Sequence, residues 1–298
     1  MNVLYSKNAR FRILAHCILL AISMLLSGQV FAQTFADGDL TYSTVEVPAG
    51  QVKVTGCAAD PCATSDIEIP VTATDATTYS VTRIKENAFA RRNITSVTIP
   101  STITVIEFSA FEVNALASLI IPDSVAAIGN GAFFNNVIRS LILPATVTAL
   151  GQGVFEENEL TNLTIQEGVE SIPASTFAGN NLAIVTIPSS VTTIGVSAFE
   201  QNNLTLVAFK GNRGSFDDQM FGNNLNLARI TYCEGASGWP GAPFNRGIPN
   251  TSTDTVTATP VDCAVIPGAT PVPLAPLWLL GIMAGLLSVL GIRKLPQA

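Results

Sequence analysis

The segment NLAIVTIPSSVTTIGVSAFEQ, residues 181–201, is one copy of a pattern that recurs along the middle of the chain. Its phenylalanine belongs to a column of seven that are spaced by a constant 22 residues. Chance does not place seven of the 15 phenylalanines in this way, so the interval indicates a stack of equivalent coils. The column consists of Phe89, Phe111, Phe133, Phe155, Phe177, Phe199 and Phe221.

Each coil also contains an apolar pair whose members are separated by one residue, such as Leu141/Leu143 and Val185/Ile187. This alternation is typical of a short strand with one buried face. A proline follows most of the pairs, and it ends the strand because it removes a ladder donor. One coil offers too few inward side chains to form a core alone, so neighbouring coils must stack.

Asparagine follows the phenylalanine by three residues in six of the coils. A sharp corner leaves backbone donors and acceptors unpaired, and a short amide side chain can reach them. We therefore expect a buried structural ladder, and the alternative is a polar ligand groove. The column consists of Asn114, Asn136, Asn158, Asn180, Asn202 and Asn224.

The quoted repeat resembles the BspA-type bacterial leucine-rich repeat, with its LxxIxIPxxVxxIgxxAF pattern and a Cys or Asn after the Phe. The chain departs from the pattern at Gln166, Lys210 and Tyr232, which stand in the proline column. The resemblance implies a leucine-rich-repeat solenoid of the α/β-solenoid class. Its 22-residue coils would be mostly β and loop, with short parallel strands and a cap at both ends. Family members are surface or secreted proteins, several implicated in adhesion, so the resemblance also implies a surface binding protein.

The N-terminal end has the features of an export signal. Basic residues precede an apolar run over 13–26, and small residues suited to signal peptidase follow at Val30 and Ala32. We expect residues 1–32 to be a cleaved signal peptide. An uncleaved anchor is the alternative, although the apolar run is short for a bilayer.

The C-terminal end has the features of an anchor. Residues 274–292 are uncharged and long enough to span a bilayer, and Arg293 and Lys294 follow them directly. We expect 274–298 to be a transmembrane or sorting segment with a basic tail, and the alternative is a buried core helix. The layout resembles an exosortase-type (PEP-CTERM-like) sorting signal, but Pro271-Val272-Pro273 lacks the Glu of that signal. The expected location is the cell envelope or surface, with anchoring through this segment.

The remaining boundaries follow from the repeat. We expect an N-terminal β-rich cap with the first strand at 33–78, seven repeats at 79–232, a disulfide-linked C-terminal cap at 233–263 and a Pro-rich stalk at 264–273. Four cysteines lie outside the signal segment and allow three pairings. The local pairings Cys57–Cys62 and Cys233–Cys263 are favoured because each pair sits in its own flank. Half of a zinc site is the alternative for the first pair.

Residues 33–272 carry ten Lys or Arg against 22 Asp and Glu, a difference of −12. This acidic body argues against nucleic acid as a partner. The single histidine, His16, lies in the signal segment, which leaves no His for a catalytic triad or a metal site. We expect no enzyme activity, cofactor or metal. The densest carboxylates fall on predicted corners, where charge is typical of a solvated surface; they are Glu156, Glu157, Glu159, Asp217 and Asp218.

Two functional classes remain, and both use the outward side chains of the strands. The first is a surface protein that binds a protein or glycan partner, as in adhesion. The second is a structural component of the envelope, a spacer or self-associating scaffold. Ile120 and Ile142 are the outward aliphatics, and Thr98 and Ala208 extend their column. The candidate binding face consists of Ile120, Ile142, Thr164, Thr186, Ser118, Ser140, Asn162 and Ile184.

Overall fold

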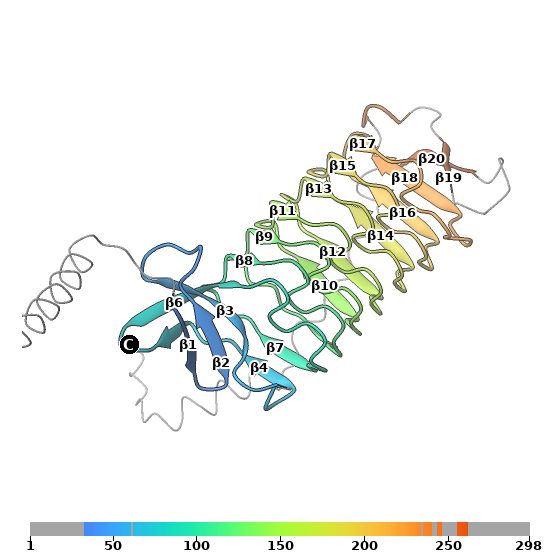
Figure 1. Cartoon of the computed structure of the whole chain (residues 1–298). Helices are drawn as coiled ribbons and strands as arrows, with labels where there is room; N and C mark the ends of the chain where they lie inside the picture. The colour runs from blue at the N-terminus through green and yellow to red at the C-terminus, as the bar shows by residue number, and fades with distance from the viewer. Residues whose placement is uncertain (1–32, 61, 234, 240–242, 246–254, 262–298) are drawn as a thin grey trace, which may run out of the picture.

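The computed structural model describes residues 33–60, 62–233, 235–239, 243–245 and 255–261. Over these residues the chain forms strands and turns and no helix, so none of them could cross a membrane as a helix. The strands stack along one axis into an elongated, strand-rich solenoid (Figure 1). The predicted signal peptide, stalk and C-terminal segment lie outside the described residues.

Parallel strands line one side of the solenoid, and those between residues 96 and 209 are the ones that the apolar pairs predicted. Strand β10 pairs in register with β12, so Leu141 lies opposite Leu163, 22 residues later. Strand β18 follows β16 after 23 residues, because Arg229 pairs with Leu206. The strands are β4 (Asp66–Glu68), β7 (Ser96–Thr98), β10 (Ser140–Leu143), β12 (Asn162–Ile165), β14 (Ile184–Ile187), β16 (Leu206–Phe209), β18 (Arg229–Cys233) and β20 (Thr255–Val261), with β19 (Pro243–Asn245) antiparallel to β20.

Residues 118–121 do not form the strand that their alternation predicted. Leu119 and Ile121 nevertheless point inward and are buried. Alternation therefore fixed which side chains face the core, but it does not determine whether two backbones approach closely enough to form a ladder.

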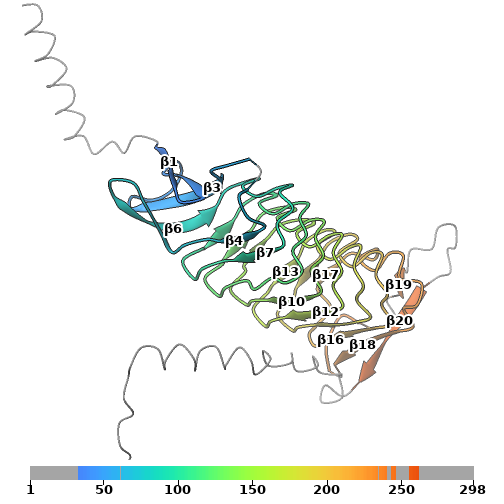
Figure 2. The same ribbon diagram turned by 90° about the horizontal axis from the view of Figure 1, so that it is seen from below.

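The opposite side carries a second set of short parallel strands. These are β8 (Val105–Ile106), β9 (Ala127–Ile128), β11 (Ala149–Leu150), β13 (Ser171–Ile172), β15 (Thr193–Ile194) and β17 (Ser215–Phe216). The N-terminal end is closed by β1 (Thr34–Asp37), β2 (Leu40–Ser43), β3 (Gln51–Cys57), β5 (Thr72–Thr74) and β6 (Thr78–Ile84), of which β6 pairs with β8. Figure 2 shows these strands at one end of the solenoid and β18 to β20 at the other.

The predicted phenylalanine column is the centre of the core. All seven rings are fully buried, and successive ring centroids are 5.2 to 5.9 Å apart. In the middle of the stack, Phe155 lies nearly parallel to Phe133 and Phe177, with interplanar angles of 4° and 5°. Stacking of a large ring on the equivalent ring of the next coil holds the coils in a fixed register.

The predicted asparagine column forms a ladder along one corner. The amide nitrogen of Asn180 donates to the carbonyl oxygens of Phe155 at 2.9 Å and Phe177 at 3.1 Å. Its side-chain oxygen accepts the backbone N–H of Leu160 at 3.0 Å. Equivalent bonds recur at the other five asparagines, from Asn114 to Asn224. The column is therefore structural, because its polar atoms are used within the corner.

The two flanks of the repeat array are fastened by different contacts. Cys57 and Cys62 form the predicted disulfide, and the loop between them is joined to the first coil by an ion pair of Asp60 with Arg92. Cys233 also takes part in a disulfide, but its predicted partner, Cys263, lies outside the described residues. At the C-terminal end the buried Trp239 donates from its indole nitrogen to the Gly211 carbonyl at 3.1 Å. Its ring stacks on that of Tyr232.

Candidate functional site

The outward side chains of the parallel strands form the surface that we call the strand face. It has three columns, which correspond to the first, third and fifth positions counted from the start of a strand. Along the coils from Ser96 to Ala208 none of these positions carries a charge. They are Ser96, Ser118, Ser140, Asn162, Ile184 and Leu206; Thr98, Ile120, Ile142, Thr164, Thr186 and Ala208; and Pro100, Pro122, Pro144, Gln166 and Pro188, of which Pro144 and Pro188 are buried.

Three isoleucines stand out on this surface because they remain in contact with solvent. Ile120 is 82% exposed, Ile184 is 50% exposed and Ile142 is 39% exposed. Ser118, Ser140 and Asn162 beside them are exposed, whereas Thr164 and Thr186 are half-buried. The structure thus brings all eight predicted residues of the binding face onto one surface, with short side chains between the aliphatic ones.

One residue that we expected on the exposed face is buried. Ala208 points outward as its strand position requires, but it has no exposed surface because it packs with Cys233, Ala236 and Val261. Thr231, at the next position along the column, is also buried. The uncharged, uncovered part of this column therefore runs from Thr98 to Thr186.

Charged residues mark the two ends of the strand face. Asp66 and Glu68 lie on β4 at the N-terminal end, where the Asp66 carboxylate accepts hydrogen bonds from the hydroxyls of Thr95 and Ser96. Lys210 and Arg229 lie at the C-terminal end, and all four side chains are exposed. The sequence placed Lys210 in the proline column, but it did not show that Asp66, Glu68 and Arg229 continue the columns, because β4 and β18 are joined to their neighbours by steps of 30 and 23 residues rather than 22.

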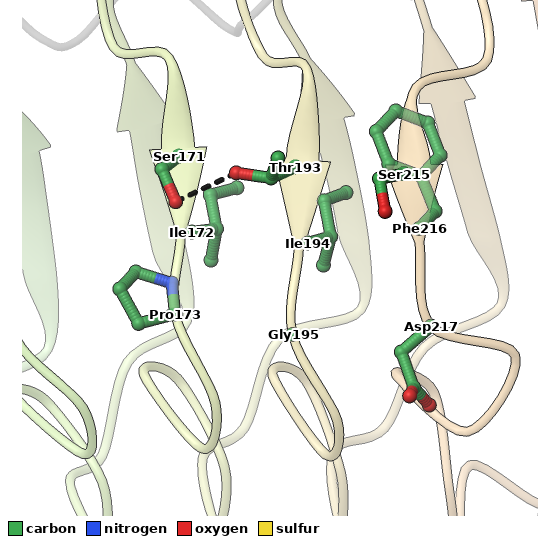
Figure 3. A pocket seen from close by; sticks show the side chains of 9 residues that line it. All are labelled: Ser171, Ile172, Pro173, Thr193, Ile194, Gly195, Ser215, Phe216 and Asp217. Atoms are coloured by element: carbon green, nitrogen blue, oxygen red, sulfur yellow. Dashed lines mark hydrogen bonds between the residues drawn. The ribbon is translucent and has the colours of Figure 1, made fainter.

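A shallow open groove lies over the other side of the solenoid, on β13, β15 and β17 (Figure 3). The hydroxyl of Thr193 donates to that of Ser171 at 2.7 Å. The Asp217 carboxylate accepts a hydrogen bond from the backbone N–H of Gln219. These two hydroxyls and this carboxylate therefore already have partners. The groove is lined by Ser171, Ile172, Pro173, Thr193, Ile194, Gly195, Ser215, Phe216 and Asp217.

The two predicted carboxylate clusters are parts of the surface. Glu159 pairs with Arg139 at 3.0 Å and Asp218 pairs with Arg213 at 2.9 Å. Partial burial raises the pKa of Glu156, and the carboxylates of Glu157 and Glu200 add to the effect. Within the described ranges no group of three or more His, Cys, Asp or Glu could hold a metal ion. The Asp37-Gly38-Asp39 segment is a tight turn between β1 and β2, with Gly38 at a φ of 60°.

The repeats match a known family over most of their length. The model of the BspA type leucine rich repeat region matches in six copies, over residues 35–159, 82–205 and 148–245. The chain belongs to the BspA-type leucine-rich-repeat family. None of the curated proteins compared with it matches.

This BspA-type chain is similar to solved structures, of which one supports the fold. The pneumococcal vaccine antigen PcpA is 18% identical, with a TM-score of 0.56 and coverage of 77% of this chain and 70% of the antigen. A leucine rich cell surface protein from Faecalibacterium prausnitzii A2-165 is 20% identical, with a TM-score of 0.46 and coverage of 68% and 71%. At these identities the likeness to PcpA supports the fold alone.

Proposed function

We propose that this protein is an exported, non-catalytic BspA-type protein of the cell surface that binds a protein or glycan partner through its strand face. The observation that carries the proposal is the exposure of Ile120, Ile142 and Ile184 on the uncharged middle of the strand face. Monomeric proteins place single aliphatic side chains at the surface often, but three on one side of a rigid solenoid form a contact patch. The short side chains around them let a partner approach the sheet closely.

Location at the surface is part of the same proposal. Residues 1–32 would be removed as a signal peptide, and 274–298 would hold the protein at the envelope. The ectodomain would comprise a cap at 33–78, the repeats at 79–232 and a second cap at 233–263, with a stalk at 264–273. A surface position also agrees with the disulfide Cys57–Cys62, since such bonds persist outside the cytoplasm.

Charge substitution tests the proposal. Ile142→Lys places an ammonium group on the strand face, where any partner would have to desolvate it. Ala149→Lys is the matched control, because Ala149 is exposed on β11 at the opposite side. Both variants should melt as the unchanged protein does, with a difference below about 0.5 kcal/mol. Only Ile142→Lys should lose binding to the surface extract of the source cells. Equal binding by both variants would overturn the proposal.

The alternative is a structural component of the envelope that acts as a spacer or scaffold. A regular solenoid with stacked rings and a buried amide ladder suits such a role, because each coil adds a fixed length. The two proposals differ in the behaviour of Ile142→Lys. A pure spacer would tolerate the substitution without any change in binding or assembly.

A further inference from the structure

We propose that the occupant of the strand face is a second copy of this chain, bound face to face with the two solenoids antiparallel. The inference rests on the proposed function, because it assigns a partner to the same surface. It is carried by the distribution of charge along that surface and by the position at which the exposed column ends.

The charges at the two ends of the strand face have opposite signs. Asp66 and Glu68 lie at the N-terminal end, and Lys210 and Arg229 lie at the C-terminal end. A parallel pair of copies would place acid against acid and base against base. An antiparallel pair places each acidic end against the basic end of the other copy, so the surface complements itself in that orientation alone.

The uncovered column fixes the register of the pair. Its uncharged part has five positions, from Thr98 to Thr186, with Ile142 at the midpoint. A two-fold axis through Ile142 brings the Ile142 side chains of the two copies together at the centre. The same axis places Glu68, three strand positions before Ile142, opposite Ala208, which lies three positions after it and two residues before Lys210. One symmetry axis therefore brings the apolar centres of the two copies together and places each acidic end near the basic end of the other copy.

The side chains of the central columns allow the two sheets to meet. Between Ser96 and Pro188 they are Ser, Thr, Asn, Gln, Ile and Pro, and the Arg139 guanidinium, which directly precedes β10, is paired with Glu159. Stacked sheets pack about 10 Å apart when such side chains interdigitate. The face is narrow, so we expect a weak dimer with a dissociation constant that is micromolar or higher. Tethering to one surface raises the effective concentration and favours pairing.

Charge exchange tests the orientation. The full chain is kept soluble in a non-ionic detergent whose density matches that of the solvent. Its association is measured by sedimentation across a concentration series at low salt. Glu68→Lys alone and Lys210→Glu alone should each weaken the dimer roughly tenfold, because each places like charges together. The double variant should restore association to about the strength of the unchanged protein. Melting of all four proteins should agree, which separates loss of pairing from loss of folding.

Cross-linking tests the register. Ile142→Cys lies on the proposed axis, so a bismaleimide that spans about 10 Å should join two copies. Thr98→Cys is the control, because its counterparts would be separated by four strand spacings, about 19 Å along the face. Cross-linking at both positions would indicate parallel copies and overturn the orientation. An unchanged protein that stays monomeric throughout the series would overturn the second copy as occupant. The proposed function would survive that result if Ile142→Lys still abolished binding to the surface extract.

Discussion

The asparagine ladder gives the sharpest prediction about stability, and Asn180 is the position at which to test it. Asn180 is 5% exposed in the middle of the array. Asn180→Ala removes the acceptor of the Leu160 N–H and the side-chain donor to the Phe155 carbonyl. The Phe177 carbonyl keeps a second donor from Asn202 at 2.9 Å, so it is not left unpaired.

The cost follows from these two orphaned groups. A buried polar group that loses its partner costs about 1 to 3 kcal/mol. Asn180→Ala should therefore lower the free energy of unfolding by about 2 to 6 kcal/mol. Urea denaturation followed by circular dichroism measures the change. Asn181→Ala is the control, because Asn181 is the exposed neighbour. Its side-chain oxygen accepts a long hydrogen bond of 3.5 Å from the amide nitrogen of Asn203, so its removal should cost little.

Asn180→Asp sharpens the test. A carboxylate keeps the shape and the acceptor, but it cannot donate to the carbonyl oxygens that surround it. The burial should raise the carboxyl pKa in the folded state, so the loss of stability should be full at neutral pH and shrink as the pH falls through the folded pKa. Equal stability of Asn180→Ala and Asn181→Ala, or an Asn180→Asp variant as stable as the unchanged protein at pH 7, would refute a structural role for the column.

Four further outcomes are expected. Phe155→Ala should cost about 3 to 5 kcal/mol by leaving a cavity between two stacked rings, whereas Thr148→Ala, on the exposed surface, should cost almost nothing in thermal unfolding. Gly195→Ala should lower the free energy of unfolding by about 1 to 3 kcal/mol, because the new Cβ would lie 2.6 Å from the backbone nitrogen of Ala174; Thr193→Ser, beside it, should be neutral. Since burial raises the pKa of Glu156, its ionised form destabilises the folded state, so Glu156→Gln should raise the melting temperature at pH 7 and the gain should vanish below the ordinary carboxyl pKa of about 4.3. A chain that ends at Thr270 should appear in the medium while the full chain fractionates with the envelope; retention of the shortened chain would contradict anchoring through 274–298.

The sequence predicted the interior of the solenoid better than its surface. A strict interval makes every coil equivalent, so one physical argument about Phe155 or Asn158 holds for the whole column. The inward and outward side chains of the strands followed from alternation for the same reason. The eight residues of the candidate binding face could therefore be assigned to one side of the solenoid from the sequence, and their role in binding stays a prediction.

The ends of the strand face could not be found in this way. Asp66 and Arg229 lie beyond the regular interval, so only the strand pairing shows that they continue the columns. The burial of Ala208 was missed because Cys233 and Val261, which pack against it, follow the last regular coil. Alternation also could not show that 118–121 lacks a ladder, since the distance between backbones depends on packing across coils.

Isoleucine methyl NMR tests most directly whether the strand face is the contact surface. The methyl signals of Ile120, Ile142 and Ile184 should shift or broaden as the concentration of the protein rises, and they should do so together. Signals of the buried Ile172 and Ile194, which belong to the opposite side, should stay unchanged. Association of the protein, or binding to a surface extract, without any change at the three exposed isoleucines would contradict the account.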